Sequence, residues 1–263
     1  MIMLKHAMKG FVAVGLAAVF AAAPVAVAED DAPGINVGGV SGDDTTGSIT
    51  GIVKFDGKQA PRRPIDMSTD AFCNNAHDEP ARQETFVFGE NDTLQNVFVY
   101  ITGGLEGKDI PDPERQAVLD QHGCVYTPHV SGVVTGQTLT IKNSDQTLHN
   151  VKLVNPQKNP AFNQSTLAGA SMDKTFSNVE MPLSFACDVH AWMNAYVYVV
   201  AHPFFAVTQD KGTFEIHGLP PGKYQVSVSH EFSRFEPVEG TVEVTVAAGQ
   251  KAEANFTYQV KKQ

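Results

Sequence analysis

Apolar and polar residues alternate in short runs along most of the chain, and turn-forming residues separate the runs. In residues 49–55 the apolar positions share one parity, Ile52 is out of phase, and Asp56-Gly57 ends the run. A second apolar run, Val97–Ile101, is rich in β-branched and aromatic residues. Strict alternation over several residues, bounded by a turn signal, predicts a β-strand with one buried face.

The same pattern continues to the C-terminus. One helix candidate interrupts it, Pro113–His122, which is short and equally compatible with a loop. Many short strands with turn residues between them favour an all-β sandwich over alternating β and α units. The further strands that we predict are 125–129, 137–142, 150–154, 174–179, 183–186, 195–201, 213–217, 224–228, 241–246 and 254–260.

The first 28 residues have the features of an export signal. Lys5 and Lys9 give a positive start, Phe11–Ala22 is apolar but too short to span a bilayer comfortably, and Ala26–Ala28 is a small-residue cleavage site. Acidic residues follow at once, which disfavours a retained membrane anchor. We therefore expect a periplasmic or secreted mature chain without an integral membrane segment. Residues 29–46, rich in Gly, Asp and Thr, are expected to be a flexible lead-in.

The charge of the expected mature chain limits its partners. Without residues 1–28 it holds 17 basic and 29 acidic residues, a formal charge of −12. Nucleic acids favour basic proteins, so we expect no nucleic-acid partner. The acidic charge permits steering toward basic protein partners but identifies none. About 235 residues are enough for one large or two small β units.

Candidate chemistry is concentrated between Cys187 and Met193, which enclose His190 and so place a thiol, an imidazole and a thioether within seven residues. A second imidazole, His149, lies 38 residues upstream of Cys187. Two His, one Cys and one Met are the ligands of blue-copper centres. The C-x2-H spacing alone also occurs in zinc sites, but zinc would want a second Cys or a carboxylate. Asp188 is the nearby candidate, and beside Cys187 it would point away.

The ligand order His, Cys, His, Met resembles that of the cupredoxins, and the C-x2-H-x2-M loop is similar to that of amicyanin. The pattern from Tyr126 to Asp145 resembles the strand pair that precedes the first His in plastocyanin-like proteins. The resemblance covers residues 126–200 and implies a Greek-key sandwich. It also implies one copper ion, as Cu(II) or Cu(I), held by His149, Cys187, His190 and Met193. In the alternative, these four are ordinary packing residues, which leaves their order unexplained.

The same resemblance gives roles to three neighbours of the ligands. Asn150, directly after the first His, would brace the Cys187 loop by hydrogen bonds. Phe185 would pack inward ahead of the thiolate. Trp192 has two interpretations, an apolar collar at an exposed edge of His190 where a redox partner docks, or a core aromatic beneath the loop.

The copper interpretation also accounts for an odd number of cysteines in an exported chain. With Cys187 held as a metal thiolate, Cys73 and Cys124 can pair. Such a disulfide would close a loop of about 50 residues and stabilise the fold by roughly 4 kcal/mol. The alternative is buried free thiols, which an oxidising compartment disfavours.

Two glycine-rich patterns flank the copper-ligand region. G-x-I-x-G-x-V-x-F-x-G at 47–57 and G-x-F-x-I-x-G-L-P-P-G-x-Y at 212–224 resemble the two halves of a carboxypeptidase-regulatory-like, or transthyretin-like, β-sandwich. We therefore expect a cupredoxin unit at 105–202, nested in or fused to a sandwich formed by 47–104 and 203–260. The alternative is a tandem arrangement of 47–202 followed by 203–260.

These features lead to a one-electron carrier as the expected function. A redox protein, such as a cytochrome or a dehydrogenase, would be its partner, and electrons would pass through the edge of His190. One alternative is copper storage or delivery without a redox partner. Another is a carbohydrate- or protein-binding module, which rests on the transthyretin-like resemblance alone.

We do not expect an enzyme. The H-x-H and H-C-H patterns of multicopper enzymes are absent, as are phosphate-loop, H-E-x-x-H and G-x-S-x-G motifs. Six other histidines of the mature chain carry no local motif. Among them, His129 is expected to be a strand-edge residue and not a ligand.

Overall fold

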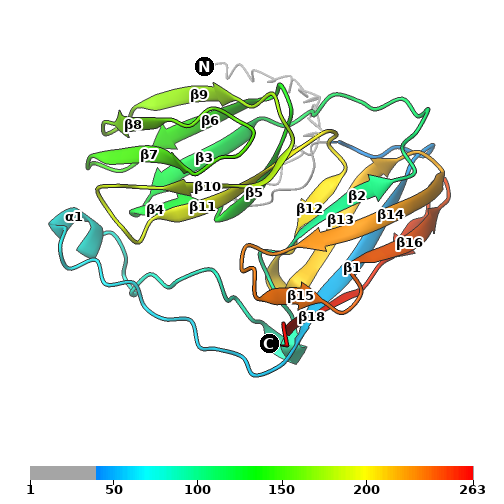
Figure 1. Ribbon diagram of the computed structural model, residues 1–263, viewed down its shortest axis with the longest axis horizontal. Helices are drawn as coiled ribbons and strands as arrows, with labels where there is room; N and C mark the ends of the chain where they lie inside the picture. Colours follow the sequence, from blue (N-terminus) through cyan, green and yellow to red (C-terminus); the bar gives the residue numbers. More distant parts are fainter. Residues whose placement is uncertain (1–39, 263) are drawn as a thin grey trace, which may run out of the picture. The chain divides into compact units, whose positions relative to one another are not determined.

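The computed structural model describes residues 40–262 (Figure 1). The predicted signal peptide and residues 29–39 of the lead-in lie outside the described residues. In the described part of the lead-in, the Asp43 side chain accepts hydrogen bonds from the backbone N–H groups of Thr45 (2.9 Å) and Thr46 (3.1 Å). The first strand begins directly after this turn.

Strands are by far the commonest regular element of the described chain and helical turns are few and short, which confirms the all-β class. Among the described residues, no helix has the length and apolar character needed to cross a membrane. The strands are β1 Gly47–Asp56, β2 Phe98–Gly103, β3 Ala117–His122, β4 Val125–Thr127, β5 Val130–Val134, β6 Thr138–Asn143, β7 His149–Val154, β8 Asn163–Thr166, β9 Ser171–Thr175, β10 Glu180–Ala186, β11 Asn194–Val200, β12 Phe205–Val207, β13 Thr213–Leu219, β14 Gly222–Ser229, β15 Phe235–Pro237, β16 Thr241–Val246, β17 Lys251–Glu253 and β18 Phe256–Val260. The helical turns are α1 Ala71–Asn74, η1 Glu90–Asp92 and η2 Asp210–Gly212.

The strands form four sheets, which belong to two sandwiches. Strands from both ends of the chain make the sheets β13-β1-β18-β15, with β17 added on β1, and β12-β2-β14-β16. We call this pair the terminal sandwich. Strands from the middle of the chain make the sheets β5-β11-β10-β7-β8 and β4-β3-β6-β9, which we call the inserted sandwich. The strand pairing is therefore nested along the chain, because β1 pairs with β13, β17 and β18 across the whole inserted segment.

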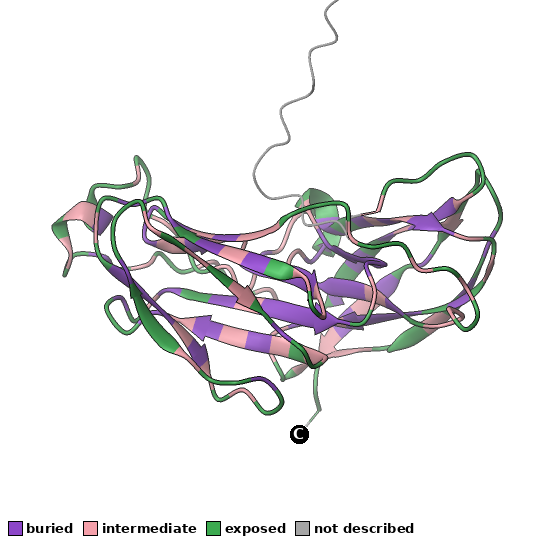
Figure 2. Ribbon diagram, turned by 90° about the horizontal axis from the view of Figure 1, so that it is seen from above, coloured by how far each residue is buried: buried purple, intermediate pink, exposed green. Residues whose placement is uncertain are grey.

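Each sandwich has its own apolar core, built by residue alternation. In β1, Gly51, Val53 and Phe55 are buried while the residues between them are exposed, including the out-of-phase Ile52. The side chains of Val53 and Phe55 join a core with β2, β13, β14, β16 and β18. A second core lies between the two sheets of the inserted sandwich and includes Cys187 and Met193. Figure 2 shows the alternation of buried and exposed positions along the strands.

A third, smaller core joins the two sandwiches. The Phe98 ring on β2 stacks on Tyr198 of β11 with ring centroids 4.2 Å apart, and Phe205 packs beside them. Nearby, His129 Nε2 lies 2.9 Å from a carboxylate oxygen of Glu231, and both side chains are buried. Burial lowers the pKa of His129, but the neighbouring Glu231 outweighs this effect and the net shift is upward. His129 thus directly precedes the edge strand β5, close to the expected strand-edge position, and is buried at the junction of the two sandwiches.

The helix expected at Pro113–His122 was wrong, because residues 117–122 form strand β3. Leu119 and Gln121 are fully buried, whereas Asp120 and His122 are not, which is a period of two. A parallel pairing with β6 fixes this period, and such tertiary pairing overrides a short stretch of helix-compatible residues. The strand expected at 174–179 is displaced, since β9 ends at Thr175.

Gly51 provides a test of the β1 packing. A Cβ atom at this position would lie 1.8 Å from the Ala254 carbonyl oxygen, which belongs to the backbone and cannot turn away. We expect Gly51→Ala to lower the free energy of unfolding by about 1–3 kcal/mol through overpacking. Urea denaturation of the disulfide-intact protein measures this loss. Ile52→Ala, on the exposed face of the same strand, is the control, and an equal loss in both variants would contradict the packing argument.

Candidate metal centre

Three strands of the inserted sandwich position the predicted ligands. His149 is the first residue of β7, and Cys187 directly follows β10, which pairs antiparallel with β7. The loop from Cys187 to Met193 joins β10 to β11 in an antiparallel pair. Two backbone hydrogen bonds close this loop, from Cys187 N–H to the Met193 carbonyl (3.3 Å) and from Met193 N–H to the His190 carbonyl (3.0 Å). The sheet therefore brings residues 149 and 187–193 to one end of the sandwich.

The side chains of the predicted ligands converge in the interior. Ligand atoms of His149, Cys187 and His190 all lie within 4.8 Å of one another. The two imidazoles face each other through Nδ1 atoms that are 2.9 Å apart. Met193 packs in the same core as Cys187. His149, Cys187, His190 and Met193 are 0%, 3%, 2% and 1% exposed, so the centre is shielded from solvent.

A carboxylate binds the outer nitrogen of each imidazole. His149 Nε2 lies 2.8 Å from Asp145 Oδ2, and His190 Nε2 lies 3.2 Å from Asp70 Oδ2. Because a carboxylate accepts hydrogen bonds, each Nε2 carries the proton and donates it. In the neutral form of each ring the inward Nδ1 then keeps a lone pair, which is the tautomer that a metal-binding imidazole needs.

The charges at the centre favour a thiolate beside an imidazole. Burial raises the pKa of Cys187, but hydrogen bonds from His149 and from the Asn150 backbone N–H outweigh it and the net shift is downward. Burial lowers the pKa of His149, but Asp145 and the Cys187 thiolate raise it to about 9. The thiolate is the form of cysteine that binds metals.

Asn150 and Phe185 both lie next to Cys187. Asn150 Oδ1 accepts a hydrogen bond from the Asp188 backbone N–H (2.6 Å), and Asn150 N–H points at Cys187 Sγ (3.4 Å). Both contacts tie β7 to the start of the ligand loop. Phe185 is 1% exposed and packs in the core beneath Cys187. The Asp188 carboxylate pairs with Lys152 at 2.8 Å, away from the centre.

The predicted disulfide between Cys73 and Cys124 is present. It joins α1 to the turn between β3 and β4, and both cysteines are buried. Cys73 Sγ lies 3.6 Å from His190 Nε2. The Cys124 carbonyl accepts a hydrogen bond from Trp192 Nε1 (3.0 Å). The disulfide therefore packs against the outer side of the ligand loop.

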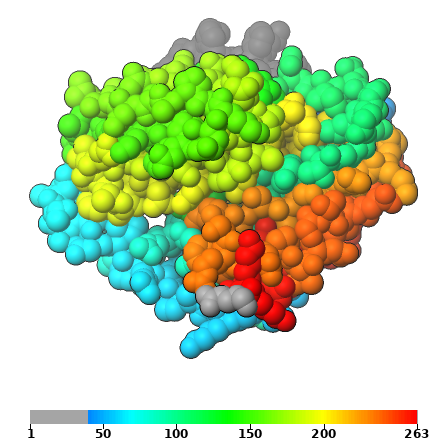
Figure 3. Space-filling model, in the orientation of Figure 1, coloured from blue at the N-terminus to red at the C-terminus, as the bar shows by residue number. Residues whose placement is uncertain are grey.

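The expected exposed edge of His190 is wrong in this fold. The connection from β1 to β2, residues 57–97, supplies Asp70 and Cys73, and we call it the covering segment. It lies on the outside of the molecule (cyan in Figure 3) and places α1 over the outer edge of the His190 ring. Trp192 is half-buried and packs on the His190 ring with centroids 5.0 Å apart. Its ring thus contributes to the cover and does not surround an open edge.

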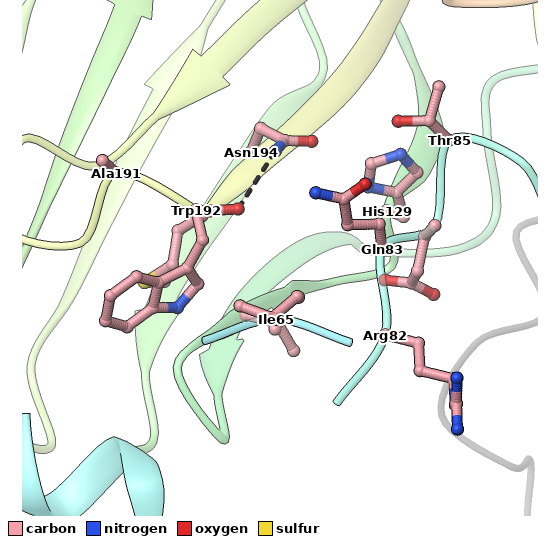
Figure 4. A pocket seen from close by; sticks show the side chains of 11 residues that line it. Ile65, Arg82, Gln83, Thr85, His129, Ala191, Trp192 and Asn194 are labelled. Carbon is pink, nitrogen blue, oxygen red and sulfur yellow. Dashed lines mark hydrogen bonds between the residues drawn. The ribbon is translucent and has the colours of Figure 1, made fainter. Parts of the chain in front are cut away.

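A cavity of about 210 Å³ adjoins the ligand loop on the side of the covering segment. Figure 4 shows Trp192 and Asn194 on one side of it, Arg82, Gln83 and Thr85 on the other, and His129 at its wall. Met193 also lines it, so the cavity reaches the C-terminal end of the ligand loop. The complete lining is Ile65, Arg82, Gln83, Glu84, Thr85, Val125, His129, Ala191, Trp192, Met193 and Asn194.

Sequence reasoning gave no role to the two carboxylates. Asp145 stands four residues before His149, and this D-x-x-x-H spacing could have suggested a local partner. Asp70 is 120 residues from His190 and has no signal in the sequence near the ligands. Only the folding of the covering segment onto the inserted sandwich brings it there.

No protein-family model matches the sequence, and no curated protein shows significant similarity. Several solved structures match part of the chain. A copper-containing nitrite reductase from Thermus scotoductus SA-01 has 17% identity and a TM-score of 0.31, with 38% of this chain and 25% of that chain covered. A Cu(I) form of an amicyanin variant has 20% identity and a TM-score of 0.30, with 38% and 97% covered. A purple cupredoxin from Nitrosopumilus maritimus has 20% identity and a TM-score of 0.28, with 32% and 99% covered. At these scores the similarity alone establishes neither a family nor a function.

Asp145→Asn tests the role of the buried carboxylate. Its two oxygens accept hydrogen bonds from Gly123 N–H (2.6 Å), Cys124 N–H (2.8 Å) and His149, and an amide has only one accepting oxygen. We expect the free energy of unfolding of the metal-free protein to fall by about 1–3 kcal/mol in urea denaturation at pH 7. Asp188→Asn, in an exposed ion pair, is the control and is expected to show no measurable change.

The pH dependence of this loss follows from the pKa of Asp145. Burial raises that pKa, but hydrogen bonds from His149 and the two backbone N–H groups hold it below its ordinary value of 3.8. A carboxyl with a lowered pKa stabilises the fold above its unfolded pKa and loses this contribution as the pH falls through its folded pKa. The difference between wild type and Asp145→Asn is therefore expected to narrow below about pH 4. A constant difference would contradict an ionised Asp145.

Proposed function

We propose that the chain is a copper protein in which His149, Cys187, His190 and Met193 hold one copper ion. The observation that carries the proposal is the pair of inward Nδ1 atoms, 2.9 Å apart beside the Cys187 thiol. With both outer nitrogens donating to carboxylates, the two Nδ1 atoms are the ring positions that face the buried space, and a metal ion would displace the proton that the raised pKa of His149 keeps there in the metal-free protein. The residues present therefore fit a metal ion.

The donor set favours copper over zinc. A thiolate, two imidazoles and a thioether are the ligands of blue-copper electron-transfer sites, in which Met is a weak axial donor. Structural zinc sites take four Cys or His ligands, and catalytic ones use a carboxylate or water. Asp188, the nearest carboxylate in sequence, is engaged with Lys152 at 2.8 Å. The carboxylates of Asp145 and Asp70 accept hydrogen bonds from Nε2 of His149 and His190.

Bound copper would supply a one-electron Cu(II)/Cu(I) couple. The chain's part is to keep the ligands still and to exclude water, so that the electron moves with little rearrangement. His149 begins β7, Cys187 directly follows β10 and Met193 directly precedes β11, so paired strands position these three ligands. The carboxylates of Asp145 and Asp70 fix the orientation of the His149 and His190 rings. Electron transfer without bond chemistry, and so without an enzyme activity, is the function that this arrangement supports best.

The cellular setting is part of the same proposal. The predicted signal peptide and the disulfide support an exported, periplasmic or secreted protein. A formal charge of −12 on the mature chain supports a redox partner with a basic face, such as a cytochrome or a dehydrogenase. We assign the copper centre to a cupredoxin domain at 105–202, nested in a transthyretin-like sandwich of 47–104 and 203–260.

Copper storage or delivery is the second candidate, and the burial of the ligands favours it. All four ligands are 3% exposed or less, and the covering segment blocks the outer edge of His190. Electron transfer weakens with distance from the surface, whereas a retained ion benefits from a closed site. A fast, reversible redox couple in voltammetry would select the carrier, and ready transfer of Cu(I) to an acceptor chelator would select delivery.

Addition of Cu(II) to the disulfide-intact apo protein tests the proposed site. We expect an intense thiolate-to-copper charge-transfer band that saturates at one copper per chain. Cys187→Ala is expected to abolish the band because it removes the thiolate. His217→Ala, a half-exposed histidine on β13, is the control and is expected to leave the band unchanged. Retention of the band in Cys187→Ala, or saturation well above one copper, would refute the site.

A further inference from the structure

The outer side of the metal centre carries a second set of metal-binding groups. Asp70, Cys73 and His190 place ligand atoms within 4.8 Å of one another, and so do Cys124, Asp145 and His149. Each group uses the imidazole of one inner ligand, approached from its outer side. In the disulfide, the two sulfur atoms are bonded to each other and are poor donors, so these groups are complete only after reduction.

The protein holds both cysteines in place independently of the bond between them. Asp145 accepts from Cys124 N–H at 2.8 Å, and Asp70 accepts from Cys73 N–H at 3.0 Å. The Cα atoms of the two cysteines are 5.5 Å apart, which lets both thiolates reach one ion. His190 Nε2, at 3.6 Å from Cys73 Sγ, lies beside them and becomes a third donor when the ring proton is on Nδ1 instead, so His190 serves one of the two sites at a time.

We propose that Cys73 and Cys124, as the dithiol, form a second copper site that binds Cu(I) together with His190 Nε2. Two thiolates are soft ligands of the kind that suits Cu(I). The site is buried, since Cys73 and Cys124 are 1% and 0% exposed, so a bound ion is kept from water and oxidant. The proposal rests on copper as the metal of the inner centre, but it requires neither Cys187 nor Met193.

The change between the two states is a thiol–disulfide exchange. Two thiols of a reductant, RSH, become RSSR, and the two electrons and two protons that they give up convert the disulfide into two cysteine thiols. The thiols lose their protons when the metal binds. The oxidised chain thus has the inner centre alone. The reduced chain has a second position where copper can bind, on the outer side of the His190 ring. This arrangement suits copper loading before the disulfide closes.

A Cys187→Ser variant isolates the outer site, because its remaining thiols are Cys73 and Cys124. The variant is reduced with a phosphine, freed of reductant under anaerobic conditions, and titrated with Cu(I) against the chromophoric chelator bicinchoninate. We expect one Cu(I) per chain with a thiolate-to-copper absorption band near the ultraviolet. The oxidised form of the same variant is expected to bind Cu(I) at least 100-fold more weakly.

The triple variant Cys73→Ser, Cys124→Ser, Cys187→Ser is the matched control. Equal Cu(I) affinity in this control and in the reduced single variant would overturn the proposal. Reduction could also loosen the chain and leave two unstructured thiols, so a second comparison is needed. Adding His190→Ala to the reduced Cys187→Ser variant is expected to weaken binding at least 10-fold, with far-UV circular dichroism as the check of folding.

His122→Ala provides the parallel control for that comparison. Its side chain is 74% exposed and stands two residues before Cys124 without contacting the sulfur, so affinity is expected to stay the same. If His190→Ala leaves the affinity unchanged, the thiols bind without the built site and the proposal fails. The inner centre is tested separately by Cu(II) on the oxidised wild type, so failure of one site is distinguishable from failure of the other.

Discussion

The hydrogen bonds of the Asp145 carboxylate are the interaction on which the rest of the metal centre depends. One group, 3% exposed, accepts from the backbone of Gly123 and Cys124 and from the His149 ring. Cys124 has a φ of 57°, in the left-handed region that non-glycine residues rarely adopt. The carboxylate compensates for this conformation, and the conformation aims the Cys124 sulfur at Cys73. The orientation of the His149 ring, the conformation of the turn at Cys124 and the position of the disulfide therefore all depend on the Asp145 carboxylate.

The two carboxylates also set the electronic character of the proposed copper site. A carboxylate behind an imidazole makes the ring a stronger donor. Stronger donation stabilises the more highly charged Cu(II), whereas the weak axial Met193 acts in the opposite direction. Burial of the site adds a third influence, because a low-dielectric surrounding disfavours net charge. The potential of such a site is a balance of these effects, set by side chains as far apart in the chain as Asp70 and Met193.

Local sequence was enough to predict many of the strands and to single out His149, Cys187 and His190, which converge in the fold, but not what covers them. Alternation predicted β1 because its inward residues are Gly51, Val53 and Phe55, and the ligand loop is short enough for its spacing to be diagnostic. Residues 117–122 were not predicted as a strand. Their strand, β3, forms by pairing with β6, which lies later in the chain. The burial of His190 was missed for a related reason. Its cover comes from an irregular segment without periodicity, and long-range packing alone decides where that segment lies.

The nested order of the strands determines which segments of the chain the candidate metal centre needs. The inserted sandwich leaves and re-enters the terminal one at adjacent points, where Ile101 N–H donates to the Phe204 carbonyl at 3.2 Å. Because these points are adjacent, a short turn could replace the inserted sandwich without breaking the backbone of the terminal sandwich. The candidate metal centre cannot be separated in the same way. Asp70 and Cys73 belong to the covering segment, which precedes the inserted sandwich in the chain. A transplanted inserted sandwich would carry its four inner ligands with one of them uncovered and with Cys124 unpaired. The complete candidate site therefore needs the covering segment as well as the inserted sandwich.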